Sequence, residues 1–462
     1  MAEGDNPLAA FIEAACVPLD SGHGSGTLDR ANAILSAHPG IATTDIIAAA
    51  ILGDDAAVRR FLAADSRAAT ATGGPRDWDA LTHLCFSRYL RLDRSRSEGF
   101  VRTATALLDT GASANTGWFE THHQPEPEWE SAIYGAAGVA HHPELTRLLL
   151  ARGADPNDEE TPYHAPETRD NAALKILVDS GKLNSDSLAT ILIRKTDWHD
   201  DEGITWLLEH GVNPNVTGRW GRTALHHAIL RDNHLAIIDV LLEHGADPTL
   251  VATRPDRSPL PSPGETAIAM AARRGRGDVL EAFERRGIPL EHRGVDRLLA
   301  ACARHDTTSV RDIATREPQL VAELLAHGGT ALATFAGVGN ADGVRHLLDL
   351  GVDVAALFSE GDGYFDIATN SLAIHVAAWR ATHATVRLLI ARGSPIDVPD
   401  GKGRTPLALA VRACVDSYWM DRRTPESVQA LLKAGASPQG VVCPSGYAEV
   451  DDLLRTFFRD QP

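Results

Sequence analysis

One frame recurs along the 462-residue chain and limits its fold more than any other feature. The clearest copy is GRWGRTALHHAILRDNHLAIIDVLLEHGADP, residues 218–248. Thr223 is a good cap for a short helix with one apolar face, and a polar turn ends that helix. A second helix follows, with Ile237, Ile238 and Leu241 at helical spacing, and Gly245 suits the left-handed residue that often ends a helix. The frame predicts a helix–turn–helix unit.

This unit resembles the ankyrin repeat, whose T-P-L-H-x-A signature appears here as Thr223, Ala224, Leu225, His226, His227 and Ala228. The resemblance is to degenerate repeats of the bacterial type, and counting weaker copies gives about eleven units. It implies an all-α ankyrin-repeat solenoid with extended finger loops and a concave face. In most family members it also implies binding of other macromolecules. Clear copies of the frame lie at 131–157, 266–287, 330–353, 372–397 and 405–415.

A repeat of this size cannot bury its own apolar stripe, so neighbouring repeats stack around a continuous core. We therefore expect no conventional domain boundary within the array. The expected parts are an N-terminal capping segment at 1–43, the solenoid at 44–440 and a C-terminal capping helix at 441–462. Insertions lengthen the fingers, and composition does not decide whether these are ordered loops or linkers. The long fingers lie near 116–130, 250–265 and 354–370.

Charge and composition narrow the class of partner. The chain has 62 acidic and 44 basic residues, a formal net charge of −18, which works against binding to nucleic acid or anionic membranes. No window approaches the roughly 18 consecutive apolar residues of a membrane span, and the N-terminus has no secretory signal pattern. The five cysteines are scattered without a C-x-x-C pair. We expect a monomeric cytoplasmic protein without a cofactor.

The stretch TPYHAPETRDN, residues 161–171, begins the frame and then interrupts it. Thr161 is a good cap and Pro162 suits the first helical position, but Pro166 stands where a continuing helix needs a backbone N–H. The pattern predicts a shortened first helix and a notch beside it. By the resemblance, His164 occupies the position of His226, and we expect it to bond within its own turn and to the neighbouring finger.

Aromatic residues concentrate in the N-terminal half. An aromatic residue in a loop is a common anchor of a binding site, although tryptophan also fixes a long finger onto a stack by burial. The first interpretation is a recognition surface for a protein partner, with carboxylates that favour a basic partner. Its expected anchors are Trp78, Trp118, Trp129, Tyr134, Tyr163 and Trp220.

The alternative is a small-molecule site or enzyme in the same groove. Carboxylates would act as acid and base while aromatic rings stack a sugar or another cyclic or cationic ligand. Familiar catalytic motifs are absent, so whether there is any catalysis stays open. The polar groups of this alternative are Glu120, Glu130, Glu160 and His164. We predict no metal site, because zinc-motif spacing is missing from the candidates His122, His123, His164, His199, Asp200 and Asp201.

Overall fold

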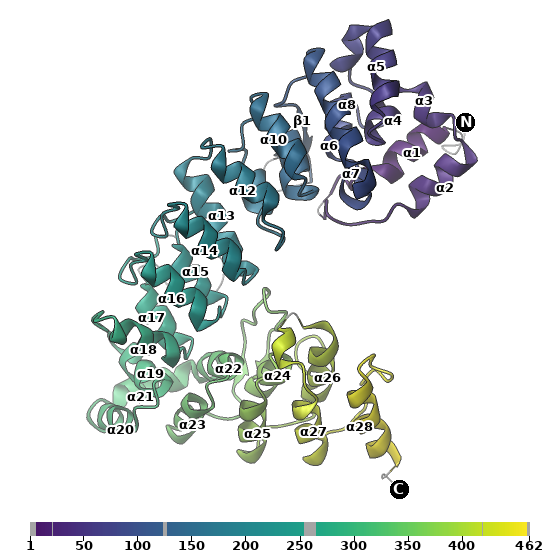
Figure 1. Ribbon diagram of the computed structural model, residues 1–462. Coiled ribbons are helices and arrows are strands. Elements are labelled where there is room, and N and C mark those ends of the chain that lie inside the picture. Colours follow the sequence, from purple (N-terminus) through teal and green to yellow (C-terminus); the bar gives the residue numbers. More distant parts are fainter. Residues whose placement is uncertain (1–5, 21, 123–126, 254–264, 418, 460–462) are drawn as a thin grey trace. The chain divides into compact units, whose positions relative to one another are not determined.

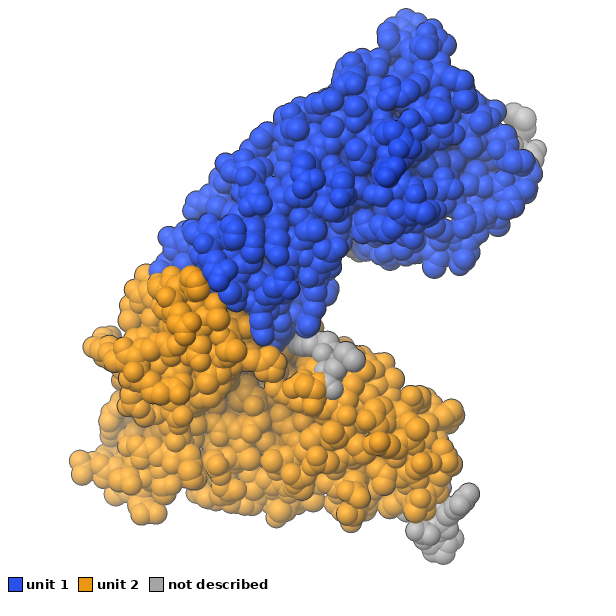
Figure 2. Space-filling view, in the orientation of Figure 1, with its two compact units in different colours: residues 1–219 blue, residues 220–462 orange. Residues whose placement is uncertain are grey.

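The computed structural model describes residues 6–20, 22–122, 127–253, 265–417 and 419–459. Most of the described chain is helical, and its strands form two short antiparallel pairs (Figure 1). This confirms the predicted all-α repeat fold. The chain divides into two compact units, residues 1–219 and residues 220–462, which we call unit 1 and unit 2 (Figure 2).

Unit 1 is a succession of short helices with one strand pair. Its elements are α1 (Pro7–Ala15), α2 (Asp29–Ala37), α3 (Ile41–Thr44), α4 (Ile46–Ile51), α5 (Asp55–Ala64), η1 (Ser66–Ala69), α6 (Ala80–Cys85), α7 (Arg88–Leu92), η2 (Arg94–Arg96), α8 (Ser97–Asp109), β1 (Gly117–Glu120), β2 (Glu128–Ser131), α9 (Ala132–Tyr134), η3 (Gly135–Val139), α10 (Pro143–Ala151), α11 (Glu160–His164), α12 (Ala172–Asp179), α13 (Ser185–Asp197) and α14 (Asp201–Glu209).

Unit 2 has the same organisation. Its elements are α15 (Ala224–Leu230), α16 (Leu235–Glu243), α17 (Ala267–Arg273), α18 (Gly277–Arg285), α19 (Val295–Ala303), α20 (Thr307–Arg316), α21 (Pro318–Ala326), α22 (Gly328–Val338), α23 (Ala341–Asp349), β3 (Leu357–Phe358), β4 (Ser371–Leu372), α24 (Ala373–Trp379), α25 (His383–Ala391), α26 (Pro406–Asp416), η4 (Met420–Arg422), α27 (Glu426–Lys433) and α28 (Ala448–Arg459). Among the described helices, none alone has the length and apolar composition of a membrane span, although the bent pair α21–α22 meets both criteria together.

The pair α15–α16 shows how the frame produces its two helices. The side chain of Thr223 accepts a hydrogen bond from the backbone N–H of His226, as predicted for a cap. The first helix ends before the turn at Asp232, and the second ends before Gly245, which has φ +84°. Glycine adopts this left-handed conformation at no steric cost.

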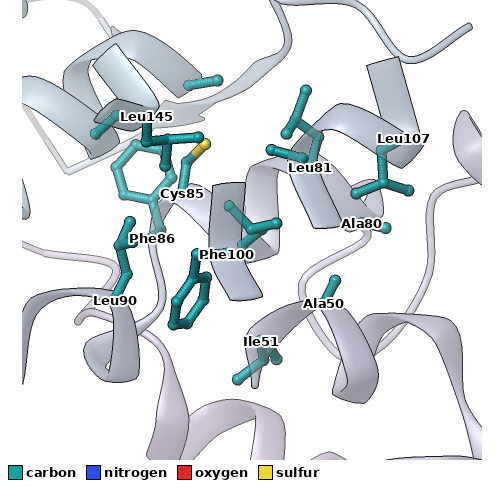
Figure 3. Packing of buried hydrophobic residues seen from close by; sticks show 14 of the residues in the cluster. Ala50, Ile51, Ala80, Leu81, Cys85, Phe86, Leu90, Phe100, Leu107 and Leu145 are labelled. Carbon is teal, nitrogen blue, oxygen red and sulfur yellow. The ribbon is translucent and has the colours of Figure 1, made fainter. Parts of the chain in front are cut away.

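Stacking of neighbouring repeats builds the core. First helices pack on first helices, as α4 does on α6 and α22 on α24, and second helices pack on second helices, as α10 does on α12. In unit 1 the side chains at these contacts form one buried apolar cluster, which includes Phe86, Phe100 and Leu145 (Figure 3). Full burial of such a side chain contributes about 1.5–3 kcal/mol.

The long fingers differ in what the structure shows of them. The described ends of the 116–130 finger pair as strands β1 and β2, and strands β3 and β4 pair at the 354–370 finger. Most of the 250–265 finger lies outside the described residues. Among the described residues, two fingers thus contain paired strands, and the ends of the 250–265 finger are joined by an antiparallel bridge between Val251 and Thr266.

In unit 2 a buried ion cluster joins repeats that are far apart in the sequence. Both carboxylate oxygens of Asp232 accept hydrogen bonds from Arg274 at 2.9 Å. Arg380, 148 residues along the chain, donates to the same carboxylate at 3.0 Å. Burial alone would raise the pKa of Asp232, but the two guanidinium groups outweigh it and lower the pKa to about 2.

We predict that Asp232→Ala lowers the free energy of unfolding by about 3–5 kcal/mol, because it leaves two buried guanidinium groups without their shared carboxylate. Urea denaturation followed by circular dichroism measures the change. The matched control is Asp349→Ala, which removes a 56% exposed carboxylate paired with Arg392 and should cost less than about 1 kcal/mol. Equal costs for the two variants would contradict the role assigned to Asp232.

Candidate functional site

The finger between α8 and α9 is a hairpin with two chemically different faces. Residues directly opposite each other in an antiparallel pair project to the same face. The register therefore puts Trp118 and Glu130 on one face and Phe119 and Trp129 on the other. The first face is buried, since Trp118 is 6% exposed, whereas Phe119 is 59% exposed. The register pairs are Gly117 with Ser131, Trp118 with Glu130, Phe119 with Trp129, and Glu120 with Glu128.

On the buried face, aromatic rings hold the finger against the stack. Trp118 stacks on Trp78 with ring centroids 4.8 Å apart, and Phe86 meets Trp118 edge-on at 5.9 Å. Tyr134 is also buried, and its hydroxyl lies 2.8 Å from Nδ1 of His23. Three of the predicted anchors, Trp78, Trp118 and Tyr134, thus lie inside unit 1, where their burial fixes the finger.

The exposed face carries an aromatic pair. The rings of Phe119 and Trp129 meet edge to face with centroids 4.7 Å apart. Trp129 is half-buried and was predicted as an anchor, whereas Phe119 was missed. The sequence signal that could have identified Phe119 is the alternation in GWFE and EWES. This alternation assigns a face to each residue only when both segments are recognised as paired strands.

The predicted acid–base residues are brought together around His164. Nε2 of His164 lies 3.0 Å from a carboxylate oxygen of Glu160, and Nδ1 lies 2.9 Å from Glu167. Burial alone would lower the pKa of His164, but hydrogen bonds to these two carboxylates outweigh it and raise the pKa to about 9. Arg194 pairs with the other oxygen of Glu167. His164 is therefore a cation at neutral pH.

Glu130 lies beside this group in a different protonation state. It is 3% exposed, and burial followed by the nearby carboxylate of Glu160 raises its pKa to about 9. Its Oε2 has no hydrogen-bond partner among the described residues and lies 3.9 Å from Nδ1 of His23. Glu130 is therefore protonated at neutral pH, and burial lowers the pKa of His23, which keeps that ring neutral.

Glu120 completes the buried face of the finger. It is 7% exposed, and its carboxylate accepts the backbone N–H of His122 at 2.8 Å. All four residues of the predicted acid–base set thus belong to unit 1 and are involved in its internal contacts.

His164 does not make the contacts of His226, the histidine at the same position of the clearest repeat, contrary to our expectation. In His226 one ring nitrogen bonds Thr223 at 2.8 Å and the other approaches the carbonyl of Glu265 in the next finger at 3.3 Å. His164 contacts two carboxylates instead, because α11 ends at His164 and the following turn, in which the Glu167 N–H donates to the His164 carbonyl at 2.9 Å, brings Glu167 back to the ring. The helix is short, as predicted, but Asp158 rather than Thr161 supplies the capping oxygen, accepting the Thr161 N–H at 2.7 Å.

The remaining predicted anchors, Tyr163 and Trp220, belong to different units. Tyr163 is half-buried, with the guanidinium groups of Arg194 and Arg219 at 4.1 and 5.5 Å from its ring centroid. Trp220 belongs to unit 2, where its ring lies 5.9 Å from that of His227.

The metal candidates do not converge within the described chain. In the part that the structure covers, no group of three or more histidine, cysteine or acidic residues could hold a metal ion, and His123 lies outside it. Asp200 is paired with the buried Nζ of Lys195 at 2.6 Å.

Comparisons with known proteins agree with this architecture. A family model described as ankyrin repeats (3 copies) matches residues 192–288. Cyclin-dependent kinase 4 inhibitor B of Bos taurus is 32% identical over 111 residues, which cover 22% of this chain and 83% of that protein. The chain belongs to the ankyrin-repeat family.

Three further known proteins are similar to parts of the chain. Cyclin-dependent kinase inhibitor 2A of Monodelphis domestica is 38% identical over 92 residues, 20% of this chain and 48% of that protein. Putative ankyrin repeat protein L92 of Acanthamoeba polyphaga mimivirus is 38% identical over 50 residues, 11% of this chain and 12% of that protein. The crystal structure of the human ASB11 ankyrin repeat domain aligns with 22% identity over 60% of this chain and 98% of that domain, with a TM-score of 0.24.

The raised pKa of His164 predicts a pH-dependent stability of the ankyrin stack. A histidine in an unfolded chain titrates near 6.5, so the ion-pair contribution is complete below about pH 6.5 and is lost as pH rises through about 9. We expect His164 to account for about 2–3 kcal/mol of the fall in the free energy of unfolding over this window, and His164→Gln to remove that part. Glu130, whose pKa is also raised to about 9, contributes a fall of the same sign that remains in the variant.

Denaturation at a series of pH values and an NMR titration of the histidine rings provide the measurements. His38→Gln, at an exposed position, is the control and should keep the full pH dependence. A His164 ring that titrates near 6.5 would show that the carboxylates do not hold it as a cation.

Proposed function

We propose that this ankyrin-repeat protein is a binding scaffold that recognises a protein partner through the exposed face of its β1–β2 finger. The observation that supports this most directly is the pair Phe119 and Trp129, whose rings pack edge to face while Phe119 is 59% exposed. An exposed aromatic group costs free energy in water, and aromatic anchors dominate the energetics of protein interfaces.

Rigidity of the finger supports the same proposal. Four residue pairs join β1 to β2, and the stacked rings of Trp78 and Trp118 fix the opposite face. A partner would meet an aromatic pair that is already ordered, so little conformational entropy is lost on binding. Trp78, Trp118 and Tyr134 then serve recognition indirectly, by holding the finger.

The chemistry around the finger favours a basic partner. Acidic residues exceed basic ones by 62 to 44 over the chain. Glu159, whose side chain is 76% exposed and lies 3.9 Å from Arg219, comes just before α11, which packs on β2. Surface carboxylates of this kind attract a cationic partner and speed its association. Ankyrin repeats are typical protein–protein interaction modules, and two relatives are named as inhibitors of cyclin-dependent kinases. On the sequence grounds given above, we propose a monomeric cytoplasmic protein.

A small-molecule or acid–base site at Glu130, Glu160 and His164 is the second candidate, since these residues do converge. The contacts of His164 and Tyr134 argue against this second candidate. Both ring nitrogens of His164 are taken by carboxylates, and the hydroxyl of Tyr134 is taken by His23. Glu130 keeps an unbonded oxygen but is 3% exposed. These groups are better suited to joining finger, helix and stack than to turning over a substrate.

We predict that Phe119→Ala and Trp129→Ala each weaken partner binding by about 30-fold, the effect of losing an interface anchor worth about 2 kcal/mol. The partner is first isolated with immobilised wild-type protein and identified, and affinities for the purified partner are then measured by biolayer interferometry.

Trp198→Ala is the matched control, because it removes a 40% exposed aromatic side chain from a different turn of unit 1. Trp220→Ala tests the predicted anchor in unit 2 in the same assay. Full affinity in both finger variants, with unchanged helicity, would disprove the proposed surface.

A further inference from the structure

Unit 2 contains a pocket of about 420 Å³ where the inter-helix turns of several repeats meet. Its walls come from the turns α15–α16, α17–α18, α19–α20 and α22–α23. Arg380 and Arg422 complete the wall from later repeats. None of these residues belongs to the finger described above, so the pocket is independent of the proposed partner surface.

Helix α21 is additional to the two-helix frame near this pocket. It stands between α19–α20 and α22–α23, and α23 packs beside α19 (Figure 1). The side-chain amide of Asn340 donates to the carbonyls of Gly275 at 2.8 Å and Ala303 at 2.7 Å. One side chain thus ties three turns together.

Two guanidinium groups in the pocket wall are held rigidly. Arg276 is 6% exposed and donates twice to Asp278, at 2.9 and 2.8 Å. Its remaining group, Nη1, is buried and has no hydrogen-bond partner among the described residues. Arg380 is 4% exposed, bonds Asp232, and lies over the ring of Phe365 at 3.8 Å.

A third guanidinium, that of Arg422, has the most distant carboxylate partner of the three. Its ion pair is with Asp421 at 3.9 Å, and that carboxylate is 63% exposed. Burial, followed by the positive charge of Arg380, lowers the pKa of Arg422, and the carboxylates of Asp421 and Asp232 oppose this shift without cancelling it. A further contribution that lowers this pKa comes from Arg276.

The wall holds four arginines and four carboxylates, and their pairing leaves Arg422 the least compensated of the arginines. Asp278 balances Arg276, and Arg304 pairs with Glu284. Asp232 is shared between Arg274 and Arg380, so one carboxylate serves two cations. Arg422 adds a further positive charge. The other two carboxylates of the wall lie at its exposed edge, Glu281 on the surface of α18 and Asp342 in a pair with the exposed Arg345.

We propose that this pocket binds a phosphorylated small molecule. Its volume lies within the range of small-ligand sites, about 300–1,000 Å³. Planar guanidinium groups fixed by their neighbours suit phosphate oxygens, which accept two parallel hydrogen bonds from one arginine. The ligand would supply a negative charge beside Arg422 and a hydrogen-bond acceptor for Nη1 of Arg276. Helices α18 and α23 also begin at the pocket, and their N-termini favour an anion.

Titration calorimetry of the full-length protein with inorganic pyrophosphate tests the proposal. We expect saturable binding, and Arg422→Gln should raise the dissociation constant by about tenfold or more, because it removes a charged donor from the site. The matched control is Arg316→Gln, whose side chain is 75% exposed on α20 and pairs with Asp312. It should bind pyrophosphate as the wild type does.

Arg422 has no close carboxylate partner, so the variant is expected to fold, and circular dichroism checks this directly. Absence of saturable pyrophosphate binding to the folded wild type would overturn the proposal. Equal affinity of wild type and Arg422→Gln would also overturn it, since the anion would then bind elsewhere. Neither result would bear on the finger of unit 1.

Discussion

Stacking between neighbouring repeats is the constraint on which the rest of this structure depends. A two-helix repeat exposes an apolar stripe that it cannot cover alone, so each repeat completes its core with residues of the next. Neighbouring repeats approach so closely at some of these contacts that a larger side chain would not fit. A Cβ on Gly275, which has φ +71°, would lie 2.6 Å from the ring of Phe335. Any departure from the frame must therefore be accommodated by neighbouring repeats.

Buried charges connect separate parts of the chain in both units. His164 meets two carboxylates where Pro166 shortens α11, and Asp232, in the α15–α16 turn, binds Arg274 and Arg380 from later repeats. Such pairs add little net stability compared with apolar packing, but they are costly to break. In this protein they join residues that are far apart in the sequence, as Asp232 and Arg380 are, and we infer that they help to specify which repeats touch.

The repeat frame could be predicted from sequence because its signals are local. Thr223, Thr266 and Thr405 each begin a unit in the sequence, and each accepts a hydrogen bond from a backbone N–H three residues on. The candidate site depended on contacts that are not local. His23 reaches Tyr134 across 111 residues, and Arg380 reaches Asp232 across 148.

The β1–β2 finger also depends on a contact that local sequence patterns do not predict. Its aromatic content identified it as a site, yet strand alternation decides which aromatic residue faces solvent. Sequence reasoning selected Trp118 as an anchor, but the register places it inside and leaves Phe119 outside. Choosing between them required the pairing of β1 with β2, which a helical repeat frame does not predict.

Both proposed sites follow from insertions into one repeating plan. Lengthening a connection costs little conformational entropy, since loop-closure entropy grows only slowly with loop length. The inserted segment gains a fixed structure only if the existing stack offers it contacts. The β1–β2 finger obtains them by burying Trp118 against Trp78, which leaves its other face free to carry Phe119 and Trp129. In unit 2 the helix α21 stands between two repeats whose turns Asn340 connects, and the arginines then surround a pocket. Binding surfaces can therefore arise in such a chain without altering the helices that carry its stability.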